Sequence, residues 1–478
     1  MAMPNEGTRR RGGGDGYDLV IVGSGSAAFA AAIRARDLGA RVAMVERSTV
    51  GGTCVNVGCV PSKTLLRAGE VRRRAELHPF DGIETRAGAV DLRALVAQKD
   101  ELVAMLRAQK YEDLIEYYGI DLIRGSARFT EAGGVDVDGE VLQGSAYLIS
   151  TGAAPAVPAV PGLTEAGYLT SASALDITAV PGSLAVFGAG AIGLELGQFF
   201  LEMGADVTLL DILDRVAPYE EPEISEAMAT ILREQGAEIH AAARIVRVER
   251  DGHRRMVVAV VGGEEITLTV DEILIATGRR ADTAHIGAEA AGIELDERGA
   301  VVVDAYLRTS NPHVYAAGDV TSAPQYVYLA AQQGALAAEN ALTGVDARMD
   351  MTALPRVTFT TPQIAAAGLG EHAAIAAGHQ VKTSVLPLSA VPRALVNRDT
   401  RGLVKIVADT DTDNVLGVHV LADGAGEVIQ AAVYAIAFGL TTADLARTWS
   451  PYLTMAEGLK LAAQTFSRDV AKLSCCAA

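Results

Sequence analysis

One pattern occurs twice in this chain and restricts its fold more than any other feature. Residues 17–22 and residues 184–187 are apolar runs typical of buried strands, and each is followed by a glycine turn and an apolar helical segment. The two turns read Gly23-Ser24-Gly25-Ser26-Ala27-Ala28 and Gly188-Ala189-Gly190-Ala191-Ile192-Gly193. In such a unit the first glycine makes the turn, the second lets a pyrophosphate approach the backbone, and the last small residue lets helix and strand pack closely. The pattern therefore predicts two doubly wound, Rossmann-like α/β domains, each with its own nucleotide.

Each unit also contains an acidic residue whose carboxylate can accept a hydrogen bond from a ribose hydroxyl. Glu46 and Asp211 each lie 23 residues after the first glycine of their turn. The Asp211 carboxylate can accept a hydrogen bond from a free 2′-hydroxyl, and it repels a 2′-phosphate. This favours NADH over NADPH. Arg215 follows four residues after Asp211 and is able to hold a phosphate, so NADPH stays open as the alternative.

Two cysteines stand in a glycine-rich segment soon after the first turn. The segment reads Gly51-Gly52-Thr53-Cys54-Val55-Asn56-Val57-Gly58-Cys59-Val60-Pro61-Ser62-Lys63. We expect it to begin a helix, whose N-terminal amides favour the thiolate over the thiol. Thiolates so placed exchange electrons with a bound cofactor or bind a soft metal ion. A structural disulfide is the simpler alternative, but the density of glycine and proline indicates a tightly shaped loop at a site.

Composition excludes several classes of partner. The 478 residues carry a formal net charge of −18, which argues against nucleic acid and anionic membranes as partners.

Residues 1–16 are polar and lack the apolar stretch of a signal peptide, so we expect a disordered leader and a cytoplasmic protein. The most apolar helical window, residues 192–204, contains acidic residues and glycines, so no membrane span is expected. The four cysteines fall into two close pairs, which indicates catalysis or metal capture rather than scaffolding.

The remaining motifs divide the chain further. Apolar residues at helical spacing predict a long helix over residues 93–118. Three strands run into glycine turns, at Thr151-Gly152, Gly278-Arg279 and Gly318-Asp319. Such turns suit contacts to the phosphates and hydroxyls of a cofactor, although a surface turn explains the last of them equally well. From residue 352 onward, short strands and helices indicate a third, α+β unit.

The order of these motifs resembles that of the pyridine nucleotide-disulfide oxidoreductases, and the resemblance covers residues 17–476. It implies an FAD-binding domain over residues 17–155 and 272–346, split by an NAD(P)-binding domain over residues 156–271. It also implies a C-terminal dimerisation domain over residues 347–478 with a mobile Cys-Cys tail. Members of the family work as homodimers, because each active site uses the dimerisation domain of the partner.

The same resemblance implies roles for individual residues. Lys63 would lie beside flavin N5 and pair with Glu195, Cys59 would contact the flavin, and Cys54 would be the interchange thiol. The residues that the resemblance implies as nucleotide-binding are Gly23, Gly25, Ser26, Ala27, Glu46, Gly52, Thr53, Gly58, Lys63, Thr151, Gly152, Gly188, Gly190, Ile192, Gly193, Asp211, Gly278, Arg279, Gly318 and Asp319.

Features near the C-terminus indicate one branch of the family. Tyr452 stands where the members that reduce organic disulfides carry a histidine base, and none of the eight histidines occupies that place. A tyrosine is a poor base at neutral pH, which disfavours disulfide chemistry. Cys475 and Cys476 are adjacent thiols, which suit a soft-metal clamp better than a disulfide. Together with Lys110-Tyr111, these features resemble the members that reduce Hg(II).

That branch implies a route for the metal ion. The implied metal ligands are Cys54, Cys59, Cys475 and Cys476. The terminal pair of one subunit would take Hg(II) from small thiols and pass it by ligand exchange to the other pair in the partner subunit, with Tyr111 and Tyr452 flanking the ion.

Two alternatives to this function stay open. A disulfide reductase of the dihydrolipoamide dehydrogenase or glutathione reductase kind is disfavoured by Tyr452, and a thiol metal buffer without turnover is disfavoured by the paired nucleotide motifs.

Overall fold

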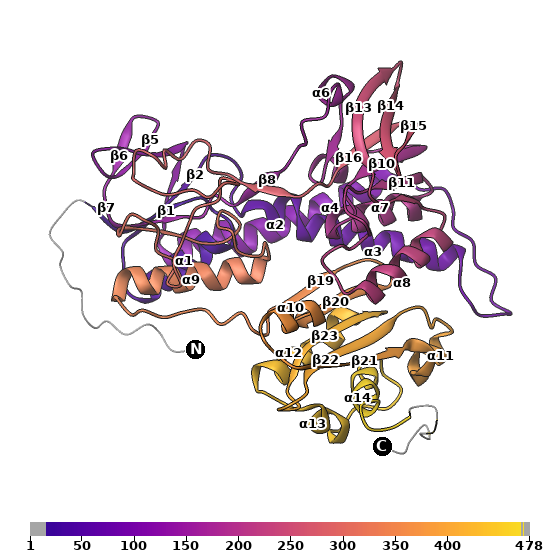
Figure 1. Cartoon of the computed structure of the whole chain (residues 1–478). Coiled ribbons are helices and arrows are strands. Elements are labelled where there is room, and N and C mark those ends of the chain that lie inside the picture. The colour runs from indigo at the N-terminus through magenta and orange to yellow at the C-terminus, as the bar shows by residue number, and fades with distance from the viewer. Residues whose placement is uncertain (1–15, 470–471, 473–478) are drawn as a thin grey trace. The chain divides into compact units, whose positions relative to one another are not determined.

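The computed structural model describes residues 16–469 and residue 472 (Figure 1). The leader expected up to residue 15 and the pair Cys475-Cys476 lie outside the described residues. The chain divides into two compact units. The first comprises residues up to 61, residues 100–154 and residues 279–349, and the second comprises residues 62–99, residues 155–278 and the chain from 350 onward. None of the helices in the described part of the chain combines the length and the apolar character needed to cross a bilayer.

A five-stranded parallel sheet forms the centre of the first unit, with the strand order β18-β7-β1-β2-β3. Its strands are β1 Tyr17–Val22, β2 Val42–Glu46, β3 Asp121–Arg124, β7 Gly144–Ile149 and β18 Val314–Ala316. Strand β1 is buried on both faces, because Leu19 and Ile21 pack into one core while Val20 and Val22 pack into another. A parallel sheet covered on both faces accounts for the unbroken apolar run of this strand.

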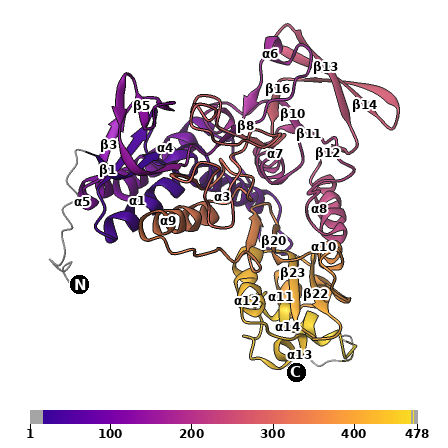
Figure 2. The same ribbon diagram turned by 60° about the vertical axis from the view of Figure 1, so that its left-hand side comes forward.

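Two helices cover one face of this sheet and a small sheet covers the other. Helices α1 (Ser26–Asp37) and α9 (Val327–Thr343) lie side by side (Figures 1 and 2). They approach closely at Gly334, where a Cβ atom would lie 2.0 Å from the carbonyl oxygen of Ala27. The opposite core includes an antiparallel sheet made of β4 Ala127–Phe129, β5 Val135–Val137 and β6 Glu140–Leu142.

The second unit contains another parallel sheet, with the order β12-β11-β10-β16-β9. Its strands are β9 Leu169–Thr170, β10 Ser183–Phe187, β11 Asp206–Leu210, β12 Glu238–His240 and β16 Glu272–Ile275. Helices α7 (Ala191–Met203) and α8 (Pro222–Glu234) pack into one core with it. An antiparallel meander, labelled in Figure 1, consists of β13 Arg244–Asp251, β14 Arg254–Val261 and β15 Glu264–Val270.

The C-terminal part of the second unit is built on an antiparallel sheet with the order β19-β20-β23-β22-β21. Its strands are β19 Pro355–Thr358, β20 Gln363–Gly368, β21 Val381–Pro387, β22 Leu403–Asp409 and β23 Val415–Ala422. Its helices are α10 Glu371–Ala376, α11 Pro392–Asn397, α12 Ala425–Ala437, α13 Thr442–Arg447 and α14 Glu457–Gln464. The predicted fold class is confirmed, since two parallel α/β sheets are followed by an α+β part.

The long helix predicted over residues 93–118 is present but not uniform. It consists of α4 (Leu92–Arg107), a π-helical turn (Ala108–Glu112) and α5 (Asp113–Tyr118). Periodicity of apolar residues does not distinguish one π turn within a helix from a continuous α-helix, so the sequence could not reveal it. Such turns occur often at functional sites, and this one carries Tyr111.

Candidate active site

The glycine turn after β1 and the cysteine segment touch each other within the first unit. Gly23 has φ +109°, and Gly52 has φ +66°. A Cβ atom on Gly52 would lie 2.6 Å from the Cα atom of Gly25. Because that distance is shorter than a van der Waals contact, only glycine fits at Gly52, and the two segments together form one tight backbone surface.

The two cysteines lie on two successive helices. Helix α2 (Gly52–Val57) contains Cys54, and helix α3 (Cys59–Glu76) begins with Cys59. Both thiols are partly exposed. The sequence predicts a single helix start for this segment, whereas the structure has two helices separated by Gly58, where a Cβ atom would lie 2.8 Å from the carbonyl oxygen of Thr53. Each cysteine is therefore near the N-terminal end of a helix, which favours its thiolate.

Tyr111 packs against the cysteine segment. Its ring lies edge-on to Phe29 with 4.9 Å between ring centroids, and a Cβ atom on Gly51 would lie 3.3 Å from the ring. Burial raises the pKa of the Tyr111 hydroxyl, the negative charge of a Cys54 thiolate raises it further, and a hydrogen bond with Ser26 lowers it. The hydroxyl next to the thiols therefore stays protonated at neutral pH and is available as a hydrogen-bond donor.

Glu46 lies at the end of β2, as the sequence predicts, and it orders the surrounding loop. Its Oε2 accepts a hydrogen bond from the Ser24 hydroxyl at 2.5 Å, and its Oε1 accepts from the Ser48 amide at 2.6 Å. Oε1 also accepts from the Ser48 hydroxyl at 3.0 Å, so Oε2 is the oxygen with further acceptor capacity. Thr151, after β7, donates to the carbonyl oxygen of Asp282 at 2.7 Å, and Gly152 has φ +71°.

Arg279 and Asp319 form a partly buried pair in the first unit. Arg279 Nε lies 4.0 Å from Asp319 Oδ2. Burial lowers the pKa of Arg279, while the charges of Asp319 and Cys59 oppose this shift. Burial also raises the pKa of Asp319, and Arg279 opposes it. The amide of Gly318 donates to Gln333 Oε1 at 2.9 Å, so the loop that presents Asp319 is tied to α9.

The second unit brings Lys63 and Glu195 together. Lys63 Nζ on α3 lies 2.7 Å from Glu195 Oε2 on α7. Glu195 Oε1 accepts a hydrogen bond from the Phe359 amide at 2.8 Å, and the Phe359 ring centroid lies 4.8 Å from Lys63 Nζ. Sequence reasoning missed Phe359, because nothing in the motifs links a residue of the C-terminal part to α3.

The second glycine turn has the same backbone requirements as the first. Gly188 has φ +103°, and a Cβ atom on Gly193 would lie 1.9 Å from the carbonyl oxygen of Gly188. Asp211 is buried, and its carboxylate accepts from the Ala189 amide at 2.5 Å and from the Leu213 amide at 2.8 Å. The Arg215 guanidinium is turned into its own loop, where it donates to the carbonyl oxygens of Pro218 and Glu220 at 3.1 and 3.3 Å.

The two glycine turns fit dinucleotides. Helix α1 begins after Gly25 and helix α7 begins after Gly190, and in the described structure neither helix has a side-chain N-terminal cap. Their first amides are therefore available to a pyrophosphate. The glycines leave room on the turns that any side chain would fill, and Glu46 and Asp211 lie at the expected distance along the chain. We conclude that the residues present suit FAD on the first turn and a nicotinamide nucleotide on the second.

Tyr452 lies in the second unit on the segment before α14. Its side chain is 48% exposed, whereas Glu457, which opens α14, is buried. Burial raises the pKa of Glu457, and a hydrogen bond from the Leu453 amide opposes this shift. Tyr452 is thus held on an ordered turn at the surface. Its expected companions Cys475 and Cys476 lie outside the described residues.

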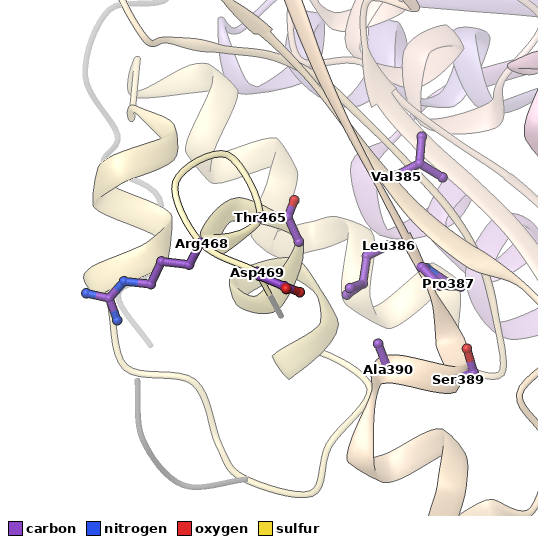
Figure 3. Close-up of a pocket in the computed structure, with 8 residues that line it drawn as sticks. All are labelled: Val385, Leu386, Pro387, Ser389, Ala390, Thr465, Arg468 and Asp469. Carbon is purple, nitrogen blue, oxygen red and sulfur yellow. The ribbon is translucent and has the colours of Figure 1, made fainter. Parts of the chain in front are cut away.

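A separate pocket lies in the C-terminal part, between the end of β21 and the end of α14 (Figure 3). Its volume is about 480 Å³, and Leu386, Pro387, Thr465 and Asp469 are among its lining residues. None of the residues that the sequence analysis singled out lines it. The chemistry-bearing side chains lie instead on the glycine turns and the cysteine segment.

Comparison with known families agrees with this distribution of motifs. The family described as pyridine nucleotide-disulphide oxidoreductase matches residues 17–334. The dimerisation domain of the same family matches residues 354–463. The two matches together span the parallel sheets with their glycine turns and the antiparallel C-terminal sheet.

Individual relatives are similar over nearly the whole chain. A protein named mercuric reductase from Staphylococcus aureus is 51% identical over 96% of this chain and 84% of its own length. Another, from Streptomyces lividans, is 51% identical over 97% of this chain and 98% of its own. Among solved structures, the Cu(II) complex of the HOCl-induced flavoprotein disulfide reductase RclA from Escherichia coli superposes with a TM-score of 0.85. It is 32% identical and covers 95% of this chain and 100% of that chain.

Proposed function

Because the chain belongs to the pyridine nucleotide-disulphide oxidoreductase family, we propose that it is an enzyme that reduces Hg(II) to Hg(0) with electrons from NAD(P)H. Relatives named mercuric reductase support this substrate. The observation that carries the proposal is the protonated Tyr111 hydroxyl beside Cys54, together with Tyr452 at the position where the disulfide-reducing members carry a histidine. Such a site can steady thiolates around a metal ion but offers no base for disulfide chemistry.

The cysteine pair is the site at which the ion would be reduced. Thiolates of Cys54 and Cys59 bind Hg(II) in preference to oxygen and nitrogen donors, because both the ion and the ligands are soft. FAD, when bound, would carry two electrons from the nicotinamide to the cysteine pair. Those two electrons convert Hg(II) to Hg(0), and the neutral atom leaves because thiolates no longer hold it. The Tyr111 hydroxyl donates to a thiolate during these steps and leaves little room for a bulky disulfide.

Each unit also holds a positively charged group that we assign to cofactor binding or thiolate stabilisation. Lys63 is held at a defined position by Glu195 and by the Phe359 ring, and we propose that its ammonium would offset negative charge on the flavin when FAD is bound. The partly buried Arg279 lowers the cost of a thiolate at Cys59 and faces Asp319. We propose that the Asp319 carboxylate accepts a hydrogen bond from a hydroxyl group of FAD.

Hg(II) would reach the site through the terminal thiols. We propose that Cys475 and Cys476 of one subunit take the ion from small thiols and pass it to Cys54 and Cys59 of the partner subunit, with Tyr452 at the crossing point. Each step exchanges one sulfur ligand for another, so the ion is never released. The dimerisation domain matched over residues 354–463 supports a homodimer. Reduced thiols of this kind are typical of the cytoplasm, where we place the enzyme.

We further propose that NADH is preferred over NADPH. The Asp211 carboxylate lies at the end of β11, where a 2′-phosphate would meet a negative charge. Arg215 donates to carbonyl oxygens of its own loop, so it is not directed toward a phosphate. These two contacts support the preference.

One experiment separates this function from its alternatives. NADH oxidation is followed with Hg(II) in excess small thiol, with lipoamide and with glutathione disulfide. The proposal expects turnover with Hg(II) alone, and turnover only with a disulfide would establish a disulfide reductase. Tight Hg(II) binding without NADH oxidation would establish a metal buffer. Replacing both Cys475 and Cys476 with serine should lower kcat/KM for thiol-bound Hg(II), and unchanged values would remove the terminal pair from the delivery route.

A further inference from the structure

Helices α3 and α7 are joined by more polar groups than Lys63 and Glu195. Glu202 lies seven residues after Glu195 on α7, so both side chains are on the same face two turns apart. Glu202 is only 3% exposed. The backbone of α3 lies directly on it, because a Cβ atom on Gly69 would be 2.5 Å from Glu202 Oε2 and 3.3 Å from the Phe199 ring.

This contact region contains a buried acceptor and a buried donor that do not meet. Among the described residues, Glu202 Oε1 and Arg72 Nε are both buried without a hydrogen-bond partner. Arg72 is nevertheless close, since its Nη1 donates to the main-chain carbonyl oxygen of Glu202. The same Nη1 lies 3.2 Å from Glu76 Oε2. Buried polar groups are rarely left unpaired, and an unpaired oxygen costs more on a charged carboxylate than on a neutral carboxyl group.

The surroundings favour the uncharged carboxyl. Burial raises the pKa of Glu202 to about 8, with Arg73 and Arg72 opposing the shift and Glu70 adding to it. Among the described residues, the strands packed on α7 carry no unpaired charged side chain toward Glu202, and β10 has no charged residue. Strand β11 contributes Val207 and Leu209 beside Gly197, and on β19 the Arg356 guanidinium is bound to Glu220 at 2.8 Å.

We propose that Glu202 is a positioning residue for Lys63: its uncharged form holds α3 against α7, and its ionisation loosens this contact and limits activity in mildly alkaline solution. An ionised Glu202 leaves a buried negative charge with one oxygen unpaired. The charge is relieved when Arg72 turns toward it, which breaks the Arg72 contact with the Glu202 carbonyl oxygen. Because α3 is one continuous helix, loosening at Arg72 changes the position of Lys63 relative to Glu195.

The test compares Glu202→Gln with the wild-type holoenzyme between pH 6 and pH 9. The amide has nearly the same shape and cannot ionise. We expect wild-type kcat to fall severalfold relative to the variant as the pH rises through about 8, with little difference below pH 7. The matched control is Glu226→Gln, which removes an exposed carboxyl from α8 and should follow the wild type throughout.

A second readout does not depend on turnover. Glu202 binds its proton more tightly in the folded protein than in the unfolded chain, so its contribution to stability is lost as the pH rises from the ordinary carboxyl range to about 8. The thermal midpoint of Glu202→Gln should therefore exceed that of the wild type by an amount that grows up to this pH and then levels off.

Parallel pH dependences of the midpoint in both proteins would overturn the proposal. A change in midpoint without any change in the pH–rate profile would overturn the link to Lys63, which is the part that rests on the proposed function. If Glu202→Gln does not fold, Arg73→Gln is the second variant, because it leaves the Arg72 contact with the Glu202 carbonyl oxygen in place. It removes a cation that favours the ionised form of Glu202, so the alkaline loss should move to higher pH, and an unmoved loss contradicts the proposal.

Discussion

Lys63 Nζ lies 2.7 Å from Glu195 Oε2, which joins helix α3 to helix α7 through an ionic hydrogen bond. The second oxygen of Glu195 is bound by the Phe359 amide, and the Phe359 ring faces the ammonium. A residue from the C-terminal part thus completes a pair made by two helices. The ammonium is held by a charge and by an aromatic ring, so its position is defined more sharply than a single salt bridge would define it.

Replacing Glu195 with glutamine tests the importance of that position. The amide retains an acceptor for the Phe359 amide but loses its charge, and hydrogen bonds to charged groups contribute about 1.5–3 kcal/mol. We expect kcat for Hg(II) reduction to fall roughly tenfold or more, with a nearly unchanged KM for the nicotinamide. Steady-state kinetics measures both constants. A variant with wild-type kcat would show that the charge of Glu195 is not needed.

Gly52 tests the contact between the cysteine segment and the first glycine turn. Alanine at this position places a Cβ atom 2.6 Å from the Cα atom of Gly25, so the two segments must separate, and we expect most of the FAD to be lost on purification. Gly39→Ala is the matched control, because Gly39 also has positive φ, +81°, but no atom within 4 Å of its Cβ position. The ratio of flavin to protein absorbance reports the result. Equal flavin contents in the two variants would show that the close contact between Gly52 and Gly25 is not needed to hold FAD.

Tyr111→Phe removes a hydroxyl and keeps the ring that packs on Phe29 and Gly51. The loss of one neutral hydrogen bond, about 0.5–1.5 kcal/mol, should lower kcat/KM for thiol-bound Hg(II) by roughly two- to tenfold. Because burial raises the pKa of Tyr111, the hydroxyl stays protonated through neutral and mildly alkaline pH, and the pH–rate profile should keep its shape in the variant. If the acidic or alkaline fall in rate disappeared from the pH–rate profile of the variant, Tyr111 would be shown to titrate during turnover.

Asp211→Asn tests the nucleotide preference. The carboxylate accepts from two backbone amides, and asparagine retains one acceptor oxygen while removing the negative charge. We expect the ratio of kcat/KM for NADPH to that for NADH to rise about tenfold, which corresponds to ~1.4 kcal/mol. Asp206→Asn, at the exposed opposite end of β11, should leave the ratio unchanged. An equal ratio in the Asp211 variant would remove this residue from specificity.

The fold follows from the sequence because its signals are local. An apolar strand, a glycine turn and an apolar helix are contiguous in the chain, and the structure places β1 before Gly23 and β10 before Gly188, as predicted. The acids Glu46 and Asp211 follow their strands for the same reason.

What the sequence could not predict depends on tertiary contacts. The π turn at Tyr111 has no signature in apolar spacing. Phe359 meets Lys63 and Glu195 only because separate parts of the second unit fold together. Glu202 looks like an ordinary polar residue on an amphipathic helix, but it is buried and lies against Gly69 of α3. The expected partners Cys475 and Cys476 lie outside the described residues, so their role stays a prediction.

Measuring mercury vapour against NADH tests the central claim most directly. The flavin-loaded enzyme is supplied without oxygen with a limiting amount of NADH and an excess of thiol-bound Hg(II), and the Hg(0) released is quantified. Two electrons leave each NADH and two are needed for each ion, so the account predicts one Hg(0) for each NADH oxidised. The release should disappear when Cys59 is replaced with serine. NADH oxidation without release of Hg(0) would contradict the account.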